Sequence, residues 1–374
     1  MKIAVNARFL QKGKLEGFGR FSHEILKRIV LAHPEHDFYF LFDRAYDDSF
    51  IYASNVTPIV IGPQARHPIL FKIWFNWSVT RQLKKINADI FISPDGYLSL
   101  RWGGKQVSVI HDLNFEHYPD DLPASASKYL RTYFPRFAKK ASRIVAVSNY
   151  TKQDIHKQYK ESLDKIDLVY NGVSDDFNPL EASTKEEIKN KWTNGEDFFV
   201  YLGSLHPRKN IPRLIEAFNS FKSSTESLNK LVLVGDAYWM RGDIKNAINN
   251  SPYTKDIIHT GRCQQKEMLG LLGSAEALCY VSYFEGFGIP LIEAMKSGVP
   301  VISGNKTSLP EVCGEAALMV DPMSVEDIAC AMIRIHKNEE LKSELIDKGF
   351  KQQAIFSWDK SAVEMWNTII KTLG

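Results

Sequence analysis

The sequence lacks the features that would mark a disulfide-rich or membrane-spanning protein. Only four of its 374 residues are cysteines, and no two of them form a C-x-x-C pair. Neither a disulfide framework nor a cysteine zinc site is therefore expected. No apolar run approaches the length that spans a bilayer, and the first residues read as a strand rather than as a signal peptide. These absences predict a cytoplasmic protein with reduced thiols.

Acidic residues are missing from two stretches of the first half, 49–88 and 122–153, and the second stretch holds seven basic residues. Residues 1–174 contain 25 Lys and Arg against 17 Asp and Glu, a net charge of +8, whereas the remainder has 22 against 27, or −5. No nucleic-acid-binding module accompanies this charge, so no nucleic-acid partner is expected. Residues 68–79 mix aromatic and cationic side chains. They predict either an amphipathic core helix or a peripheral contact with the inner face of a membrane.

Strand-like and helical segments alternate along both halves of the chain. This alternation predicts an α/β fold with parallel sheets covered by helices on both faces. The length suits two domains, which we place at residues 1–174 and 175–357, with a hinge in the polar run 174–184. A final helix is predicted over residues 358–374, because apolar side chains recur there at helical spacing.

The most informative segment is residues 283–298, which read Y-F-E-G-F-G-I-P-L-I-E-A-M-K-S-G. Short apolar runs on either side predict a strand, a turn, a helix and a second strand. The glycines allow the backbone to approach a ligand closely. Glu285 and Glu293 are good acceptors for vicinal sugar hydroxyls. The ligand-binding candidates in the turn are Gly286, Phe287 and Gly288.

A second candidate site lies about eighty residues upstream. Residues 199–203 read as a strand, and Arg208 and Lys209 precede a segment with apolar residues at helical spacing, in which Asn210 is the expected N-cap. Cations at the start of a helix favour a diphosphate, because the helix dipole and unpaired backbone N–H groups attract anions. Arg208 can clamp a phosphate with two hydrogen bonds, and Lys209 adds a point charge.

Together these segments resemble the retaining, nucleotide-sugar-dependent glycosyltransferases of family 4, group 1, and most closely the subgroup rich in bacterial mannosyltransferases. The resemblance rests on E-G-F-G-x-P-x-x-E-A-M-x-x-G-x-P-V-I from residue 285 and on G-S-L-H-P-R-K-N-I-P-R-L-I-E-A-F from residue 203. It implies the GT-B fold, in which two Rossmann-like domains face each other across a cleft and the last helix packs back on the first domain. Many members carry an Arg where this chain has Ser204.

The resemblance also implies roles for individual residues. Glu293 would bind the nucleotide ribose, Glu285 would lie against the transferred sugar, and Arg208 and Lys209 would contact the donor diphosphate. A predicted strand ends near His111, and the family has a histidine here that contacts the transferred sugar. The neighbouring Asp112 would contact the acceptor or only orient the loop.

Four further candidates depend on weaker patterns. Gly17 and Gly19 form a G-x-G without the third glycine of a dinucleotide fingerprint. They would either face the donor phosphates, as the resemblance implies, or form a simple strand-to-helix turn. Arg262 and Cys263 would border the nucleotide base. A nucleophilic role for Cys263 is the alternative, although no nearby histidine supports it.

The implied activity is transfer of a hexose, with GDP-mannose favoured as donor, to a saccharide or lipid-linked glycan in cell-surface polysaccharide synthesis. No cofactor or metal is expected, since fixed cations already serve the phosphates. A nucleotide-sugar epimerase of the same architecture is one alternative, and an NAD-dependent oxidoreductase is another that the incomplete glycine pattern disfavours. The basic first half predicts an anionic acceptor, attracted by Lys139, Lys140 and Arg143.

Overall fold

The computed structural model describes residues 1–15, 17–236 and 242–374, and the chain divides into two compact units. Unit 1 comprises Met1–Gly172 and Ser357–Gly374, and unit 2 comprises Val173–Phe356. The chain therefore leaves unit 1 two residues before the predicted boundary and returns to it for its last helix. Part of the predicted hinge, 174–184, is already helical, because the first helix of unit 2 begins at Ala182.

Unit 1 is built on a seven-stranded parallel sheet with the order β3-β2-β1-β4-β5-β6-β7. Its central strands β1, β4, β5 and β6 are rich in β-branched residues and are buried on both faces, as the inner strands of a covered parallel sheet must be. The direction of strand addition reverses between β1 and β4, which makes the carboxyl end of this pair the switch point where such sheets bind ligands. The strands are β1 (Lys2–Asn6), β2 (Asp37–Phe42), β3 (Val56–Val60), β4 (Ile90–Ser93), β5 (Lys105–Ile110), β6 (Arg143–Ala146) and β7 (Ile166–Leu168).

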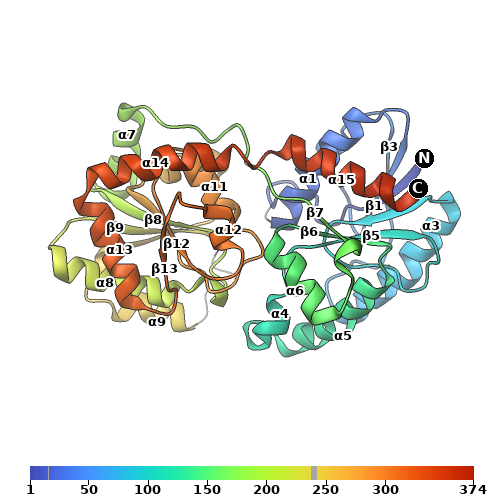
Figure 1. Cartoon of the computed structure of the whole chain (residues 1–374), viewed down its shortest axis with the longest axis horizontal. Helices are drawn as coiled ribbons and strands as arrows, with labels where there is room; N and C mark the ends of the chain where they lie inside the picture. Colours follow the sequence, from blue (N-terminus) through green and yellow to red (C-terminus); the bar gives the residue numbers. More distant parts are fainter. Residues whose placement is uncertain (16, 237–241) are drawn as a thin grey trace. The chain divides into compact units, whose positions relative to one another are not determined.

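Helices cover both faces of this sheet. The first helix and the last helix of the chain pack against each other on one side of the sheet, and α5 and α6 lie on the other side (Figure 1). Phe21 on the first helix meets Trp358 on the last at a ring distance of 6.3 Å. The helices are α1 (Gly17–Ala32), α2 (Pro68–Ile73), α3 (Thr80–Ile86), α4 (Asn114–His117), α5 (Ala124–Lys140), α6 (Asn149–Tyr159) and α15 (Trp358–Leu373).

Residues 68–79 form an amphipathic segment, which is one of the two alternatives predicted for them, and the membrane contact stays a prediction. They form α2 and a π-helical segment, Trp74–Val79. Trp74 and Phe75 are fully buried in the core. Ile69, Ile73 and Trp77, which recur every four residues, are 61%, 39% and 59% exposed. The segment therefore anchors unit 1 and also presents an apolar stripe to solvent.

Unit 2 repeats this design with a six-stranded parallel sheet in the order β10-β9-β8-β11-β12-β13. Its switch point lies between β8 and β11, because strands are added in opposite directions from this pair. The strands are β8 (Phe198–Leu202), β9 (Lys230–Val234), β10 (Ile257–Gly261), β11 (Ala277–Tyr280), β12 (Val301–Gly304) and β13 (Leu318–Val320).

The helices of unit 2 also form two layers. In Figure 1, α8, α9 and α13 lie on one side of the sheet, while α11 and α14 pack together on the other. Among the described residues, no helix is both long and apolar enough to cross a membrane. The helices are α7 (Ala182–Thr193), α8 (Ile211–Thr225), α9 (Gly242–Asn250), α10 (Gln265–Gly273), α11 (Ile289–Lys296), α12 (Leu309–Cys313), α13 (Val325–Lys337) and α14 (Glu339–Gln353).

Candidate active site

Three loops of unit 2 converge beside its switch point. They follow the neighbouring strands β8, β11 and β12 and span residues 203–210, 281–288 and 305–308. The first loop contains a short 3-10 turn, Pro207–Lys209, whose carbonyl at Arg208 accepts a hydrogen bond from the Tyr283 backbone N–H at 3.0 Å. The motifs predicted around Arg208 and Glu285 therefore belong to one site.

Glu285 lies at the centre of this site between two cations. One guanidinium nitrogen of Arg208 donates to Glu285 Oε2 at 2.8 Å and to the Phe284 carbonyl at 3.1 Å. Lys209 Nζ pairs with Glu285 Oε1 and donates to the hydroxyl of Tyr280 at 2.6 Å. The Glu285 side chain is 6% exposed and that of Lys209 is 8% exposed, whereas Arg208 reaches 21%. We call Arg208, Lys209 and Glu285 the ion triad.

The surroundings of the ion triad determine its protonation state. Burial alone opposes ionisation of Glu285, but Arg208 and Lys209 outweigh it and lower the pKa of this carboxyl to about 2. Burial, together with the charge of Glu285, raises the pKa of the Tyr280 hydroxyl well above its ordinary value. Glu285 is therefore ionised at neutral pH, and the ion triad carries a net charge of +1 in a poorly hydrated position, where it can attract a phosphate group.

The loop after β12 clamps the backbone around Glu285. The Glu285 backbone N–H donates to Thr307 Oγ1 at 3.1 Å. The buried hydroxyl of Ser308 donates to the carbonyl of Glu285 at 2.9 Å and to that of Phe287 at 3.3 Å. Thr307 has a φ of +58°, which is rare for a β-branched residue. Strained backbone of this kind concentrates at functional sites.

Gly288 and Glu293 position the second half of the motif. Gly288 has a φ of +100°, and a side chain there would meet Leu291 at 2.9 Å, so only glycine suits the turn that starts α11. Gly298 follows the helix with a φ of +67°, a left-handed conformation that glycine adopts readily and that commonly ends a helix. Glu293 is the fifth residue of α11 and is 4% exposed. It therefore lies in the second turn of the helix.

Asn210 differs from its expected role as an N-cap. It occupies that position before α8, but in the left-handed conformation and without a capping side-chain bond. Its amide nitrogen instead donates to the carbonyls of Val281 at 3.1 Å and Pro322 at 2.5 Å. Asn210 thus ties the loop that carries the cations to the loop that carries Glu285, which sequence reasoning did not foresee.

The remaining candidates of unit 2 are less tightly held. Phe287 is buried and packs edge-on against Phe356, with 5.3 Å between ring centres, so any ligand contact at this position would come from its backbone. Arg262 is exposed just after β10, and Cys263 donates to Thr260 Oγ1 at 3.3 Å. Both follow a strand at the carboxyl edge of the sheet, and their base-pocket role stays a prediction.

His111 occupies the corresponding edge of unit 1, directly after β5. Its Nε2 lies 2.8 Å from the Pro94 carbonyl. Because a carbonyl can only accept, Nε2 carries the proton and Nδ1 is left with a lone pair. Burial lowers the pKa of His111, against the opposing effects of Pro94 and Asp112. His111 is thus a neutral imidazole at pH 7, and its predicted contact with a sugar stays a prediction.

The two glycines of the G-x-G pattern in unit 1 lie at the start of α1. Gly17 is exposed as the first residue of the helix. Gly19 is buried, and a side chain there would come within 2.8 Å of the Phe9 carbonyl. Close packing therefore suffices to explain Gly19, which favours the simple turn, while the phosphate-facing role stays a prediction.

The comparisons with known sequences cover both units. The profile described as Glycosyltransferase Family 4 matches residues 17–177, and that described as Glycosyl transferases group 1 matches residues 183–352. The O-antigen chain mannosyltransferase B of Escherichia coli is 25% identical over 367 residues, which cover 95% of this chain and 96% of that protein.

The comparisons with solved structures agree with the fold. Sucrose-phosphate synthase from Thermosynechococcus elongatus matches with a TM-score of 0.80 at 16% identity, covering 99% of this chain and 98% of that one. HepE from Anabaena, solved in complex with UDP-glucose, matches with a TM-score of 0.76 at 17% identity, covering 99% and 100%. The predicted GT-B type of fold, with two parallel-sheet α/β domains, is therefore confirmed, and the chain belongs to the group 1 glycosyltransferases of family 4.

Proposed function

We propose that this enzyme transfers a hexose, with retention of configuration, from a nucleotide sugar to a saccharide or a lipid-linked glycan in cell-surface polysaccharide synthesis. GDP-mannose is the favoured donor. Support for mannose comes from the names of similar proteins, which include the mannosyltransferase B cited above and the O-antigen chain mannosyltransferase RfbU of Salmonella typhimurium. Support for a nucleotide-sugar donor comes from the complex of HepE with UDP-glucose.

The observation that carries the proposal is the ion triad. Its two cations are held by Glu285 and Tyr280 before any ligand arrives, so little reorganisation is needed when negative charge develops on a departing diphosphate. The start of α11 contributes further backbone N–H groups at the same edge. Leaving-group stabilisation of this kind allows the sugar to acquire oxocarbenium character.

The triad also bears on how configuration would be retained. A covalent intermediate needs a nucleophilic carboxylate, yet both oxygens of Glu285 already bond to cations and its pKa is about 2. A carboxylate that is so weakly basic and so firmly paired is a poor nucleophile. We therefore expect attack by the acceptor on the face that the diphosphate leaves, with Glu285 as an electrostatic and positioning group.

The proposal is tested first by a thermal-shift panel of nucleotide sugars. A donor present at a hundred times its dissociation constant should add about 2.7 kcal/mol of stability, and GDP-mannose should give the largest shift. If no nucleotide sugar stabilises the protein, the donor assignment is wrong.

The epimerase alternative is tested by incubating the stabilising donor without an acceptor, because an epimerase would still convert the sugar and a transferase would not. The configuration of the transferred sugar, determined by NMR, tests retention, and undiminished activity in EDTA is expected for a site that uses fixed cations.

A peripheral membrane contact is part of the proposal, since a lipid-linked acceptor would be presented at a membrane. The exposed stripe of Ile69, Ile73 and Trp77 supports it. Arg101 lies 3.6 Å from the ring centre of Trp77, so a cation accompanies the apolar surface, as at interfaces with anionic lipids. Co-sedimentation with anionic vesicles should fall strongly when the three stripe residues are replaced by serine. Equal co-sedimentation of the wild type and the triple serine variant would disprove this contact.

A further inference from the structure

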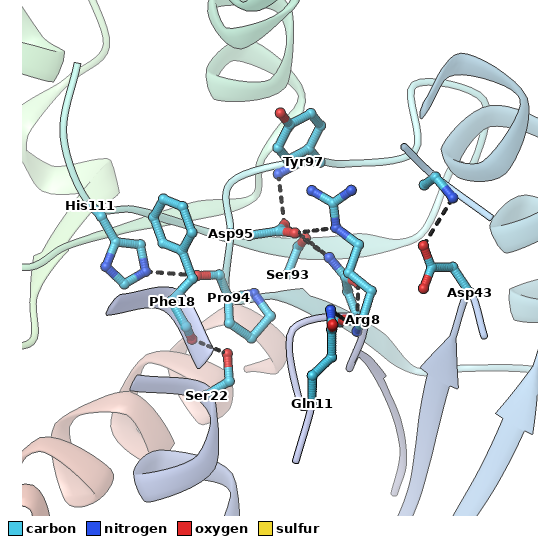
Figure 2. Close-up of polar contacts among 12 residues, drawn as sticks. Arg8, Gln11, Phe18, Ser22, Asp43, Ser93, Pro94, Asp95, Tyr97 and His111 are labelled. Atoms are coloured by element: carbon cyan, nitrogen blue, oxygen red, sulfur yellow. Dashed lines mark hydrogen bonds and ion pairs between the residues drawn. The ribbon is translucent and has the colours of Figure 1, made fainter. Parts of the chain in front are cut away.

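The switch point of unit 1 holds a buried ion pair that the proposed mechanism does not use. Arg8, just after β1, donates from Nε to Asp95 Oδ2 at 2.6 Å, and Asp95 follows β4 (Figure 2). The other carboxylate oxygen accepts from Asn6 Nδ2 at 2.8 Å, from Ser93 Oγ at 2.9 Å and from the Tyr97 N–H at 3.3 Å. Asp95 is thus held by four donors and holds Arg8 in place.

Only one edge of the Arg8 guanidinium takes part in this pair. The two terminal nitrogens point away from Asp95 in Figure 2. Besides Asp95, the hydroxyl of Tyr97 is a hydrogen-bonding group that interacts with the Arg8 side chain. The Arg8 side chain is only 5% exposed, and none of its nitrogens is among the described buried side-chain atoms that lack a partner. The two terminal nitrogens carry four N–H groups, so beside Tyr97 they can still donate to two oxygens of an anion.

A second arginine of the same unit provides the contrast. Arg44 donates to Asp43 through both Nε and a terminal nitrogen, at 2.7 and 2.9 Å. The carboxylate of Asp43 therefore occupies the edge of the Arg44 guanidinium that could otherwise bind a ligand. Arg8 instead meets its carboxylate through Nε alone, which is a geometry that fixes the guanidinium and keeps its outer edge available.

Aromatic rings surround the faces of the Arg8 guanidinium. Such rings stabilise a cation that lies over their faces, and they exclude water from it. An anion can therefore reach the N–H groups only from the side, in the plane of the guanidinium. An anion that enters there experiences a lower dielectric than at the protein surface. The distances from the guanidinium carbon to the ring centres are 4.8 Å for Phe9, 4.9 Å for Phe71, 5.3 Å for Phe75 and 4.6 Å for Tyr97.

Arg8 and His111 share one edge of the sheet and one loop. The Pro94 carbonyl accepts from His111, and the next residue, Asp95, accepts from Arg8. Phe18, which is 39% exposed, lies 4.6 Å from the His111 ring and 5.4 Å from the ring of Phe9. A ligand that lies along Phe18 could therefore touch His111 and the fork of Arg8 together.

The basic residues first considered for the acceptor lie elsewhere. Arg143 is the first residue of β6, at the amino end of the sheet, and is paired with Asp167 through two nitrogens. Lys139 and Lys140 end α5, which leads into that same amino end. Because His111 lies at the carboxyl edge, these three cations do not surround a ligand bound beside it.

We propose that Arg8, positioned by Asp95, binds an oxyanion of the acceptor, which is a phosphate or a carboxylate near the hydroxyl group that receives the sugar. The identity of the ligand as an acceptor rests on the function proposed above. The anion site itself rests on the geometry of Arg8 and Asp95. Phosphate would come from a lipid-linked acceptor and carboxylate from an acidic saccharide.

The test uses the full chain with GDP or UDP at saturation, so that the triad in unit 2 is occupied. Phenyl phosphate, phenyl glucuronide and the neutral phenyl mannoside are titrated by calorimetry into the wild type. The double variant R8Q/D95N removes the pair without leaving a buried unpaired charge, and R44Q/D43N removes the matched pair nearby. Circular dichroism melts verify that both variants fold.

We expect at least one anionic probe to bind the wild type and R44Q/D43N equally and to bind R8Q/D95N at least tenfold more weakly. Phenyl mannoside should show no such difference. Tighter binding of phenyl phosphate identifies a phosphorylated acceptor, and tighter binding of phenyl glucuronide identifies an acidic saccharide. If neither nucleotide binds, the proposed function fails. If a nucleotide binds but the anionic probes bind nowhere, or bind R8Q/D95N as tightly as wild type, this inference alone is overturned.

Discussion

The two units place charged side chains at equivalent points of equivalent sheets, but with different charge balance. In both, a cation follows the first strand of the unit and a carboxylate follows the strand beside it across the switch point. In unit 2 two cations pair with Glu285, so the net charge of the ion triad is +1. In unit 1 the charges of Arg8 and Asp95 cancel, so the pair is neutral. The topology thus explains where charges gather, and the residue content of the loops explains what they can bind.

This difference has a chemical consequence. A diphosphate leaving group gains negative charge during transfer, so an excess of fixed cations is needed beside it. An acceptor anion only has to be oriented, and a neutral pair with one directional fork is sufficient for that. The largest effects of substitution are therefore expected at the ion triad.

Removing both cations of the triad should have the largest effect. Each charge-assisted bond to the donor diphosphate is worth about 1.5–3 kcal/mol, so R208A/K209A should lose roughly 3–6 kcal/mol of donor binding, measured by calorimetry with the preferred nucleotide sugar. K191A is the control, because Lys191 forms an exposed pair with Glu267 at 2.8 Å. The double variant also leaves Glu285 buried without its partners, so R208A/K209A/E285Q should recover stability but not donor binding. Normal donor affinity in that triple variant would refute the diphosphate assignment.

Much of this arrangement could be predicted from sequence because it depends on local patterns. The apolar runs placed β8 and α15 within one residue of their observed ends. The motif around Glu285 and the cations at Arg208 and Lys209 were found because strand, turn and helix signals agreed. Their assembly into one ion triad could not be derived from spacing, since it depends on β8 and β11 becoming neighbours.

The residues that sequence reasoning missed have no local signal. Thr307 and Ser308 act on Glu285 only because β12 pairs with β11. Asn210 resembles an N-cap in sequence and instead bridges two loops. Asp95 precedes a glycine in what reads as an ordinary turn, and its bond to Arg8 spans 87 positions. Long-range pairing of this kind is what a single sequence does not reveal.

The second prediction concerns the pH dependence of stability. The pKa of Glu285 falls from 4.5 in the unfolded chain to about 2 in the folded protein. The ionised carboxylate therefore contributes stability that is complete above about pH 4.5 and is lost as the pH falls towards 2, in total about 3 kcal/mol. Urea unfolding of wild type and E285Q should show a difference in unfolding free energy that shrinks over this interval. A constant difference between pH 7 and pH 3 would contradict the ionised triad.

The third prediction separates the two glutamates. E293A should weaken the binding of GDP or UDP itself, by about 1.5–3 kcal/mol if the carboxylate accepts from the ribose hydroxyls. E285Q should leave nucleotide binding nearly unchanged and depress turnover, because its partners are the two cations next to the sugar-transfer step. Calorimetry with nucleotide and steady-state kinetics with donor distinguish the roles. Equal losses of nucleotide affinity in both variants would show that the division is wrong.

The smallest effect is expected at Ser308. Its buried hydroxyl donates to the carbonyls of Glu285 and Phe287, at 2.9 and 3.3 Å, so S308A should cost about 1 kcal/mol of stability by leaving these acceptors without a donor. The control is S343A, because the Ser343 hydroxyl donates to the Glu339 carbonyl at 3.0 Å on the exposed face of α14 and its loss should change little. Since Ser308 holds the backbone of Glu285 and not its charge, S308A should lower turnover while leaving the pH dependence of stability like that of wild type. A variant that loses the transition between pH 4.5 and 2 would instead show that the clamp is required for the ion triad itself.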